Sequence, residues 1–236
     1  MERLDKVIAA MGVASRREVK EMARQGRISV DGVPVLSPEM KVDPVRAQIR
    51  VDGELLGYQK HTYLLLHKPA GLLTATEDPH GKTVMDLLPP EYRRRSLSPV
   101  GRLDKDTEGL LLLTDDGELN HRLTSPRYHV EKTYYARTEG VLTQVDVEAF
   151  ARGIPLQDFT CLPAALELLG QGECLVTVSE GKFHQVKRML ASRGAPVICL
   201  KRLRMGPLSL DDGSVPGACR ELTEDEVQAL RDCCAL

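Results

Sequence analysis

The stretch GLLLLT at 109–114 constrains the fold of this chain most, because it is an apolar run of strand length between charged loops. The Asp115-Asp116-Gly117 turn ends it. Further strands are expected at 62–66, 132–138, 162–168 and 174–180, and helices at 144–153, at 184–193 and after the capping box 223–226. A loop is expected to start at KPAG, 68–71. Strands outnumber helices and do not alternate with them regularly, which argues against a Rossmann-type sheet. The pattern predicts an α+β fold with a mixed, mainly antiparallel sheet and flanking helices.

The first sixty residues predict a small unit of their own. Apolar residues at helical spacing indicate a helix over 4–11 that Gly12 ends, and the capping box 15–18 opens a second helix to about Arg24. RISV and VPV then read as two strands joined by the tight turn Asp31-Gly32. Because 57–61 has the character of a linker, we expect domains at 1–58 and 62–236.

A basic face is expected on the second helix. Arg17, Lys20 and Arg24 lie three and four residues apart and therefore share one side of it. Together with Arg3 and Arg16 they are candidates for RNA binding. Charge alone leaves the alternative open, which is that these side chains form an ordinary solvated helix face.

The net charge of −2 does not decide whether the partner is a nucleic acid. Seven basic and no acidic residues lie in 182–204, whereas seven acidic and two basic residues lie in 211–236. Phosphate binding depends on where positive charge gathers, not on its total.

Several classes of protein find no support in the sequence. The six cysteines form no C-x-x-C pair, so we read them as reduced thiols and expect no metal site. Nucleotide-binding, zinc-hydrolase and serine-hydrolase motifs are absent, and no cofactor is expected. No apolar segment approaches the roughly 20 residues of a membrane helix, and the N-terminus lacks the features of a secretion signal. We therefore expect a cytoplasmic protein, and a monomer.

The loop GRLDKDTEG at 101–109 holds the most informative acid. Asp104 lies between Arg102 and Lys105, basic neighbours that favour an ionised carboxylate. Such a carboxylate can act as a nucleophile or a general base. Spacing alone leaves open that this is a surface turn.

Several motifs together resemble one family. GRLD followed by T-x-GLLLLT-x-DG, with KPAG, EKTYY and EGKFHQVKRM in matching order, is similar to the bacterial ribosomal RNA pseudouridine synthases of the RsuA and RluB/E/F branch. Residues 2–50 or so resemble the S4-type RNA-binding domain of these enzymes. Within the branch, SPRYHVEKTY and SEGKFHQVKRM look most like the RsuA type, which modifies 16S rRNA. Phe183 stands where a tyrosine is frequent.

The resemblance implies roles for particular residues. Asp104 matches the catalytic nucleophile, Tyr134 the tyrosine that stacks on the target uracil, and Lys187 a basic residue that pairs with the carboxylate. Arg102 matches the arginine that enters the RNA helix as the base leaves. Arg188 is a second candidate for the pairing with Asp104 and for RNA contact.

Other functions remain to be separated from this one. A non-catalytic RNA-binding factor of ribosome assembly would explain the basic segments without requiring Asp104. A synthase of the same family acting on 23S rRNA would share every motif. A base-removing glycosylase would use a similar pocket but release free uracil.

Overall fold

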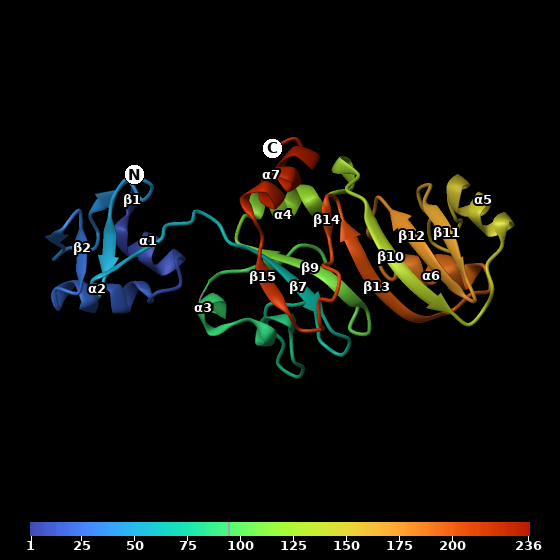
Figure 1. Ribbon diagram of the computed structural model, residues 1–236, viewed down its shortest axis with the longest axis horizontal. Helices are drawn as coiled ribbons and strands as arrows, with labels where there is room; N and C mark the ends of the chain where they lie inside the picture. Colours follow the sequence, from blue (N-terminus) through green and yellow to red (C-terminus); the bar gives the residue numbers. More distant parts are fainter. Residues whose placement is uncertain (94) are drawn as a thin grey trace. The chain divides into compact units, whose positions relative to one another are not determined.

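The computed structural model describes residues 1–93 and 95–236, which form two compact units (Figure 1). The first comprises Met1–Thr62 with Leu88–Leu97, and the second Tyr63–Leu87 with Ser98–Leu236. The domain bounds 1–58 and 62–236 stay a prediction. No helix in the described part of the chain has the length and apolar character needed to cross a bilayer.

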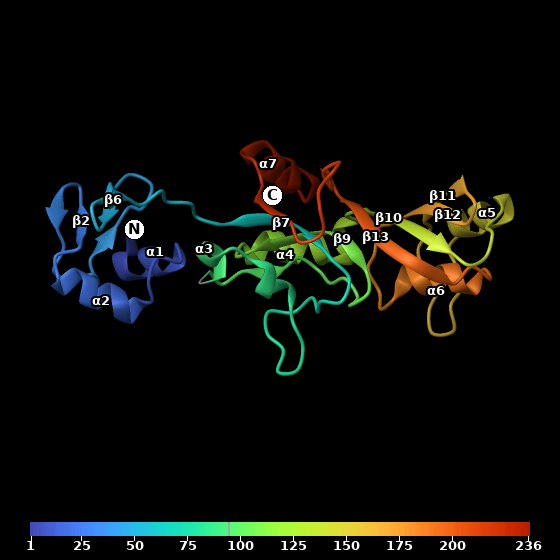
Figure 2. The ribbon, with the colours of Figure 1, turned by 60° about the horizontal axis from the view of Figure 1, so that its bottom comes forward.

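The first unit packs two helices against a small sheet (Figure 2). Helix α1 spans Leu4–Ala10, and α2 spans Arg16–Arg24 behind the predicted capping box. The strands form the order β3-β2-β5-β6 and the separate pair β1-β4. Their bounds are β1 Glu2–Arg3, β2 Ile28–Val30, β3 Val33–Pro34, β4 Lys41–Val42, β5 Ile49–Val51 and β6 Glu54–Leu55. Positive φ at both Asp31 and Gly32 gives the β2–β3 hairpin its tight turn, as the sequence indicates.

The second unit is built on one mixed, mainly antiparallel sheet, which confirms the predicted α+β fold. The main strand order is β11-β12-β10-β13-β9-β7-β15, and β14 and β8 pair with β13 and β9. The bounds are β7 Tyr63–Lys68, β8 Ser98–Pro99, β9 Glu108–Thr114, β10 Lys132–Thr138, β11 Ala165–Gly170, β12 Glu173–Val178, β13 Val197–Met205, β14 Leu208–Ser209 and β15 Cys219–Glu221. The pair β13–β9 is parallel, and the other described pairs are antiparallel.

Strand β9 lies inside this sheet, and the four leucines of the apolar run are fully buried there. Gly109 has a φ of +105°, and a Cβ on it would lie 2.2 Å from the carbonyl oxygen of Arg202. Only glycine therefore lets β13 approach β9 this closely.

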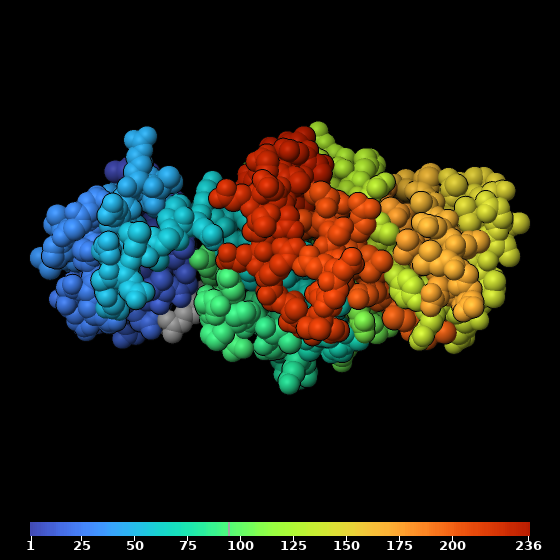
Figure 3. Space-filling model, in the orientation of Figure 1, coloured from blue at the N-terminus to red at the C-terminus, as the bar shows by residue number. Residues whose placement is uncertain are grey.

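Helices cover the sheet in two places (Figure 1). Helices α5 (Gln144–Arg152) and α6 (Gln185–Ser192) pack on β10, β12 and β13 through a core that includes Phe150 and Met189. Helices α4 (Gly117–Thr124) and α7 (Glu224–Cys233) pack on β7 and β9. Short helices lie at α3 Pro90–Arg93, η1 Val84–Leu87 and η2 Pro126–Tyr128. Buried and half-buried residues alternate along β12, and Figure 3 shows β11 and β12 at the surface.

The structure departs from the local expectations, or adds to them, at three places. Lys68 does not start a loop but ends β7 with its side chain fully buried. Asp116 does more than turn the chain, because it caps α4 by accepting a hydrogen bond from Leu119. The sequence does not predict strand β13, since basic residues interrupt its apolar ones and the buried positions Leu200, Arg202 and Met205 are not evenly spaced.

Candidate active site

The parallel pairing of β13 with β9 creates the site. Lys201 lies opposite Glu108, and Arg202 opposite Gly109. Because both strands run the same way, the segments that precede them meet at one end of the pair. The loop 101–107 precedes β9, and α6 precedes β13. This topology brings Asp104 to Lys187, although 83 positions separate them.

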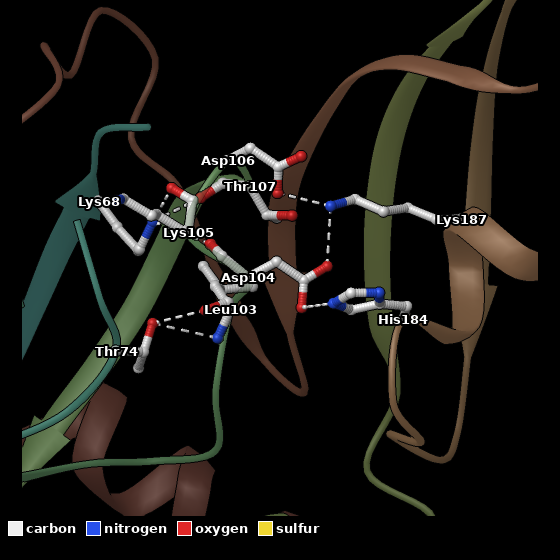
Figure 4. A network of polar contacts seen from close by, with 9 residues as sticks. All are labelled: Lys68, Thr74, Leu103, Asp104, Lys105, Asp106, Thr107, His184 and Lys187. Atoms are coloured by element: carbon white, nitrogen blue, oxygen red, sulfur yellow. Dashed lines mark hydrogen bonds and ion pairs between the residues drawn. The ribbon is translucent and has the colours of Figure 1, made fainter. Parts of the chain in front are cut away.

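Asp104 lies between Lys187 and His184, both from the α6 region (Figure 4). Its Oδ2 lies 2.9 Å from Nζ of Lys187, and its Oδ1 lies 3.4 Å from Nε2 of His184. The Asp104 side chain is 28% exposed. The carboxylate is therefore oriented firmly through one oxygen, while the other has only a longer contact and remains accessible.

Lys187 also pairs with Asp106, at 2.6 Å from its Oδ1. Burial by itself would lower the pKa of Lys187, but its hydrogen bonds to Asp106 and Asp104 outweigh burial and raise it. The same hydrogen bond from Lys187 lowers the pKa of Asp106. The ammonium group thus stays charged between two carboxylates at neutral pH.

The backbone around Asp104 is clamped from two sides (Figure 4). Nζ of the buried Lys68 donates to the carbonyl oxygens of Pro69, Asp104, Lys105 and Thr107 at 2.8–3.2 Å. Burial lowers the pKa of Lys68 to about 8, so the group is still mainly protonated at neutral pH.

The second clamp is Thr74. Its Oγ1 donates to the carbonyl of Leu103 at 2.7 Å and lies 3.3 Å from the Leu103 amide nitrogen. Carbonyls that must point at one ammonium or hydroxyl group cannot rotate freely. The loop that carries Asp104 is therefore set before any ligand arrives.

Two hollows meet at Asp104. One, which we call the inner cavity, is lined by Tyr134 of β10, Val178, Leu200 and part of α6. The other, which we call the outer groove, is lined by Leu73, Asp78, Lys105 and Phe183. Both share the walls Arg102, Asp104, Lys182 and His184. An aromatic face, a carboxylate and a basic rim thus surround a space open to solvent, an arrangement suited to a base on a phosphate backbone.

The other basic residues predicted to act at this site lie in different surroundings. Arg102 is exposed and lines both hollows. Arg188 does not pair with Asp104 but with Asp158, and its guanidinium lies 5.0 Å from the Phe159 ring centroid. Arg202 is buried and donates to the Leu110 carbonyl, so the basic stretch 182–204 is not one continuous basic surface.

The basic residues of the first unit are largely ion-paired. Arg3 and Arg16 both bind the buried Asp5, and Arg3 and Lys20 both lie near Glu39. Arg24 is 3.5 Å from Glu21, and Arg17 is exposed on α2. Arg3 and Arg16 therefore have a structural partner that the helical spacing did not predict.

Sequence reasoning missed Lys68 and Asp106 at this site. Asp106 binds Lys187 at 2.6 Å, more closely than Asp104 does at 2.9 Å. The sequence does hold an indication for Lys68. This lysine directly follows an apolar strand and precedes Pro69, a place where a buried charge needs hydrogen-bond acceptors. For Asp106 the sequence held no such indication.

The fold and the site define an RNA-modifying enzyme of one family. Residues 62–192 match the family model described as RNA pseudouridylate synthase, and residues 2–45 match the S4 domain. The chain therefore belongs to the RNA pseudouridine synthases and carries an N-terminal S4 domain.

Relatives match over almost the whole length. An uncharacterized RNA pseudouridine synthase of Bacillus subtilis, YtzG, is 43% identical over 98% of both chains. Ribosomal small subunit pseudouridine synthase A of Escherichia coli is 41% identical over 97% of this chain and 99% of the relative. A crystal structure of a pseudouridylate synthase is 35% identical, has a TM-score of 0.69 and covers 98% of this chain and all of its own. Membership of this enzyme family argues against a purely non-catalytic assembly factor.

Proposed function

We propose that this pseudouridine synthase isomerises one specific uridine of 16S rRNA, with Asp104 as the nucleophile and a target base extruded from the RNA. The observation that carries the proposal is the state of the Asp104 carboxylate. Lys187 holds one of its oxygens at 2.9 Å, while the other faces a longer contact at the meeting point of cavity and groove.

Base extrusion explains the two hollows. A uridine inside a stacked helix cannot reach a carboxylate, and flipping it out costs a few kcal/mol. The inner cavity would take the base against Tyr134, and stacking on an aromatic ring contributes roughly 1–3 kcal/mol. The exposed Arg102 would fill the place that the base leaves, and the outer groove would hold the backbone.

The reaction needs only the groups present. The Asp104 carboxylate attacks the nucleoside at the sugar C1′ or at C6 of the ring, and either route frees the N1–C1′ bond. The uracil turns, C5 bonds to C1′, the bond to the Asp104 carboxylate breaks, C5 loses its proton and N1 gains one, so substrate and product are isomers and Asp104 is regenerated. Lys187 fixes the direction of the carboxylate and offsets its charge.

The rRNA target rests on the relatives. Proteins named ribosomal small subunit pseudouridine synthase A are 40–41% identical to this chain over 97% of its length. Binding to the RNA would use the S4 domain, with Arg17, Lys20 and Arg24 on the exposed side of α2 and a further contact from Arg188. An enzyme with this target works where ribosomes assemble, and we expect it in the cytoplasm as a monomer.

The deciding experiment maps pseudouridine in rRNA from cells with and without the protein. One missing pseudouridine in 16S rRNA is expected, restored by the wild-type gene. A missing site in 23S rRNA would instead identify a large-subunit enzyme. In vitro, an rRNA transcript labelled with tritium at C5 should release tritium and no free uracil; free uracil would indicate a glycosylase.

The S4 domain is best tested by substitution. Because Leu88–Leu97 belongs to the same compact unit, deleting residues 1–58 would remove only part of that unit. Replacing Arg17, Lys20 and Arg24 by glutamine should weaken rRNA binding and flatten its salt dependence, while kcat at saturating RNA changes little. Unchanged binding would contradict the role of this face.

A further inference from the structure

We propose that Phe183 is a stacking platform for the base next to the target uridine, and so helps to select the site in the RNA. The inference rests on the proposed function, because it assumes that Asp104 works on one nucleotide of an RNA strand. It assigns Phe183 to a nucleotide other than the one that reacts. Tyr134 lines the inner cavity, whereas Phe183 lines only the outer groove.

The exposure of Phe183 is unusual for this chain. Of the three phenylalanines, Phe150 is buried in the core and Phe159 is partly buried beneath Lys182 and Arg188. Phe183 is 76% exposed. A large apolar ring in water gains free energy when a flat apolar partner covers it, which makes it a binding feature rather than a packing one.

The ring is presented by a fixed loop. The buried Glu180 accepts hydrogen bonds from the Leu162 amide and the Gln185 side chain at 2.9 and 2.7 Å, and Gln185 in turn accepts from the Lys182 amide. His184 has a φ of +50°, which turns the chain sharply after Phe183 and starts α6. A platform that is already ordered binds without a further loss of conformational entropy.

One face of the Phe183 ring is already occupied. The His184 imidazole stacks on it with ring centroids 3.8 Å apart and an angle of 19° between the planes. The high exposure therefore belongs to the other face. The same imidazole lies 3.4 Å from Oδ1 of Asp104, so a base on the free face would belong to a nucleotide close to the one under attack.

The charge of the groove favours RNA as the occupant over an apolar protein segment. Arg102, Lys105 and Lys182 line it together with Phe183, and two of its three acids, Asp104 and Asp106, are paired with Lys187. Basic groups beside an exposed aromatic ring are the usual means of holding single-stranded RNA. The groove also continues directly into the wall at Asp104. The groove therefore offers a path for the strand whose uridine enters the cavity.

Fluorescence tests the contact without requiring turnover. A uridine-centred oligoribonucleotide carries 2-aminopurine on its 5′ or 3′ side, and stacking on an aromatic ring quenches this base. The wild type and Phe183→Tyr should quench it at one of the two positions, and Phe183→Ala and Phe183→Leu should not. Equal quenching by the wild type and Phe183→Ala would overturn the inference.

Steady-state kinetics on an RNA that spans the mapped uridine measure how much Phe183 contributes to kcat/KM. Phe183→Ala should lower kcat/KM about 5- to 100-fold, mainly through KM, while Phe183→Tyr stays near the wild type. Removing the neighbouring base from the RNA should have the same effect on the wild type and no further effect on Phe183→Ala. Val141→Ala is the matched control, because Val141 is 77% exposed and lines neither hollow.

The outcomes separate the two proposals. In one outcome, Phe183→Ala turns over normally, and the substitution and the missing base act independently. That result would contradict the stacking role of Phe183 and leave the proposed function intact. A wild type that forms no pseudouridine would remove the proposed function, and the quenching experiment would still decide whether Phe183 stacks on a base.

Discussion

Asp5 of the first unit and Asp104 of the second are both aspartates that contact two basic side chains, yet their surroundings suit opposite purposes. Asp5 is 1% exposed and accepts four hydrogen bonds, two from Arg3 and two from Arg16. Asp104 is 28% exposed and has one close ion pair and one longer contact.

The difference lies in what each carboxylate can still do. Both oxygens of Asp5 are occupied by guanidinium groups, chiefly by Arg3, which lowers the pKa of this acid to about 2. Such a group stabilises the fold and cannot approach a ligand. Asp104 keeps one oxygen accessible beside a cavity, while its partners and the clamped loop keep it in place. Orientation with incomplete coordination is what a nucleophile requires.

The largest expected effect comes from replacing Asp104. Asp104→Asn keeps the shape but removes the negative charge and the nucleophilicity, so pseudouridine formation should fall at least about 1,000-fold. RNA affinity and thermal stability should stay near those of the wild type. Tritium release at a substantial fraction of the wild-type rate would disprove the role of Asp104, and Asp5→Asn, which should retain activity, is the matched control.

Lys68→Met tests whether the loop that carries Asp104 depends on the buried Lys68 ammonium group. It leaves four carbonyl groups without their buried donor, which should destabilise the protein by about 3 kcal/mol and lower kcat by misplacing Asp104. Urea unfolding and single-turnover rates measure the two effects. Lys105→Met removes an exposed lysine from the same loop and should change stability by less than about 0.5 kcal/mol.

Lys187→Met removes the close partner of Asp104. We expect kcat to fall about 10- to 100-fold with KM little changed, since the carboxylate loses its direction and two acids lose a shared cation. Lys187→Arg should recover part of the rate. Arg188→Met alters the neighbouring residue, which binds Asp158, and should leave kcat nearly unchanged. A rise in KM with kcat unchanged would show that Lys187 binds RNA instead.

The smallest effect is expected at Asp5, and it is one of stability. Its lowered pKa means that its contribution, about 1–2 kcal/mol, is present above pH 4 and is lost as the pH falls toward 2. Asp5→Asn should therefore be less stable than the wild type at pH 7 and nearly equal to it near pH 2. Urea unfolding at several pH values tests this; a difference that does not depend on pH would contradict it.

Much of the fold followed from local pattern. The capping boxes at Ser15 and Thr223 and the tight turn Asp31-Gly32 depend on neighbouring residues, and the structure has each of them. Strand β13 was missed because its central place in the sheet shows only in contacts with β9 and β10.

The sequence by itself determined the family, the α+β class and the loop that holds Asp104, because motifs and periodicity are properties of adjacent residues. Only the tertiary structure decided which cation meets which acid. Lys187 and Arg188 are neighbours in the chain, but they point to Asp104 and Asp158 because successive helical residues face different ways. Likewise, burial and the number of donors separate Asp5 from Asp104, and both depend on residues far away in the sequence.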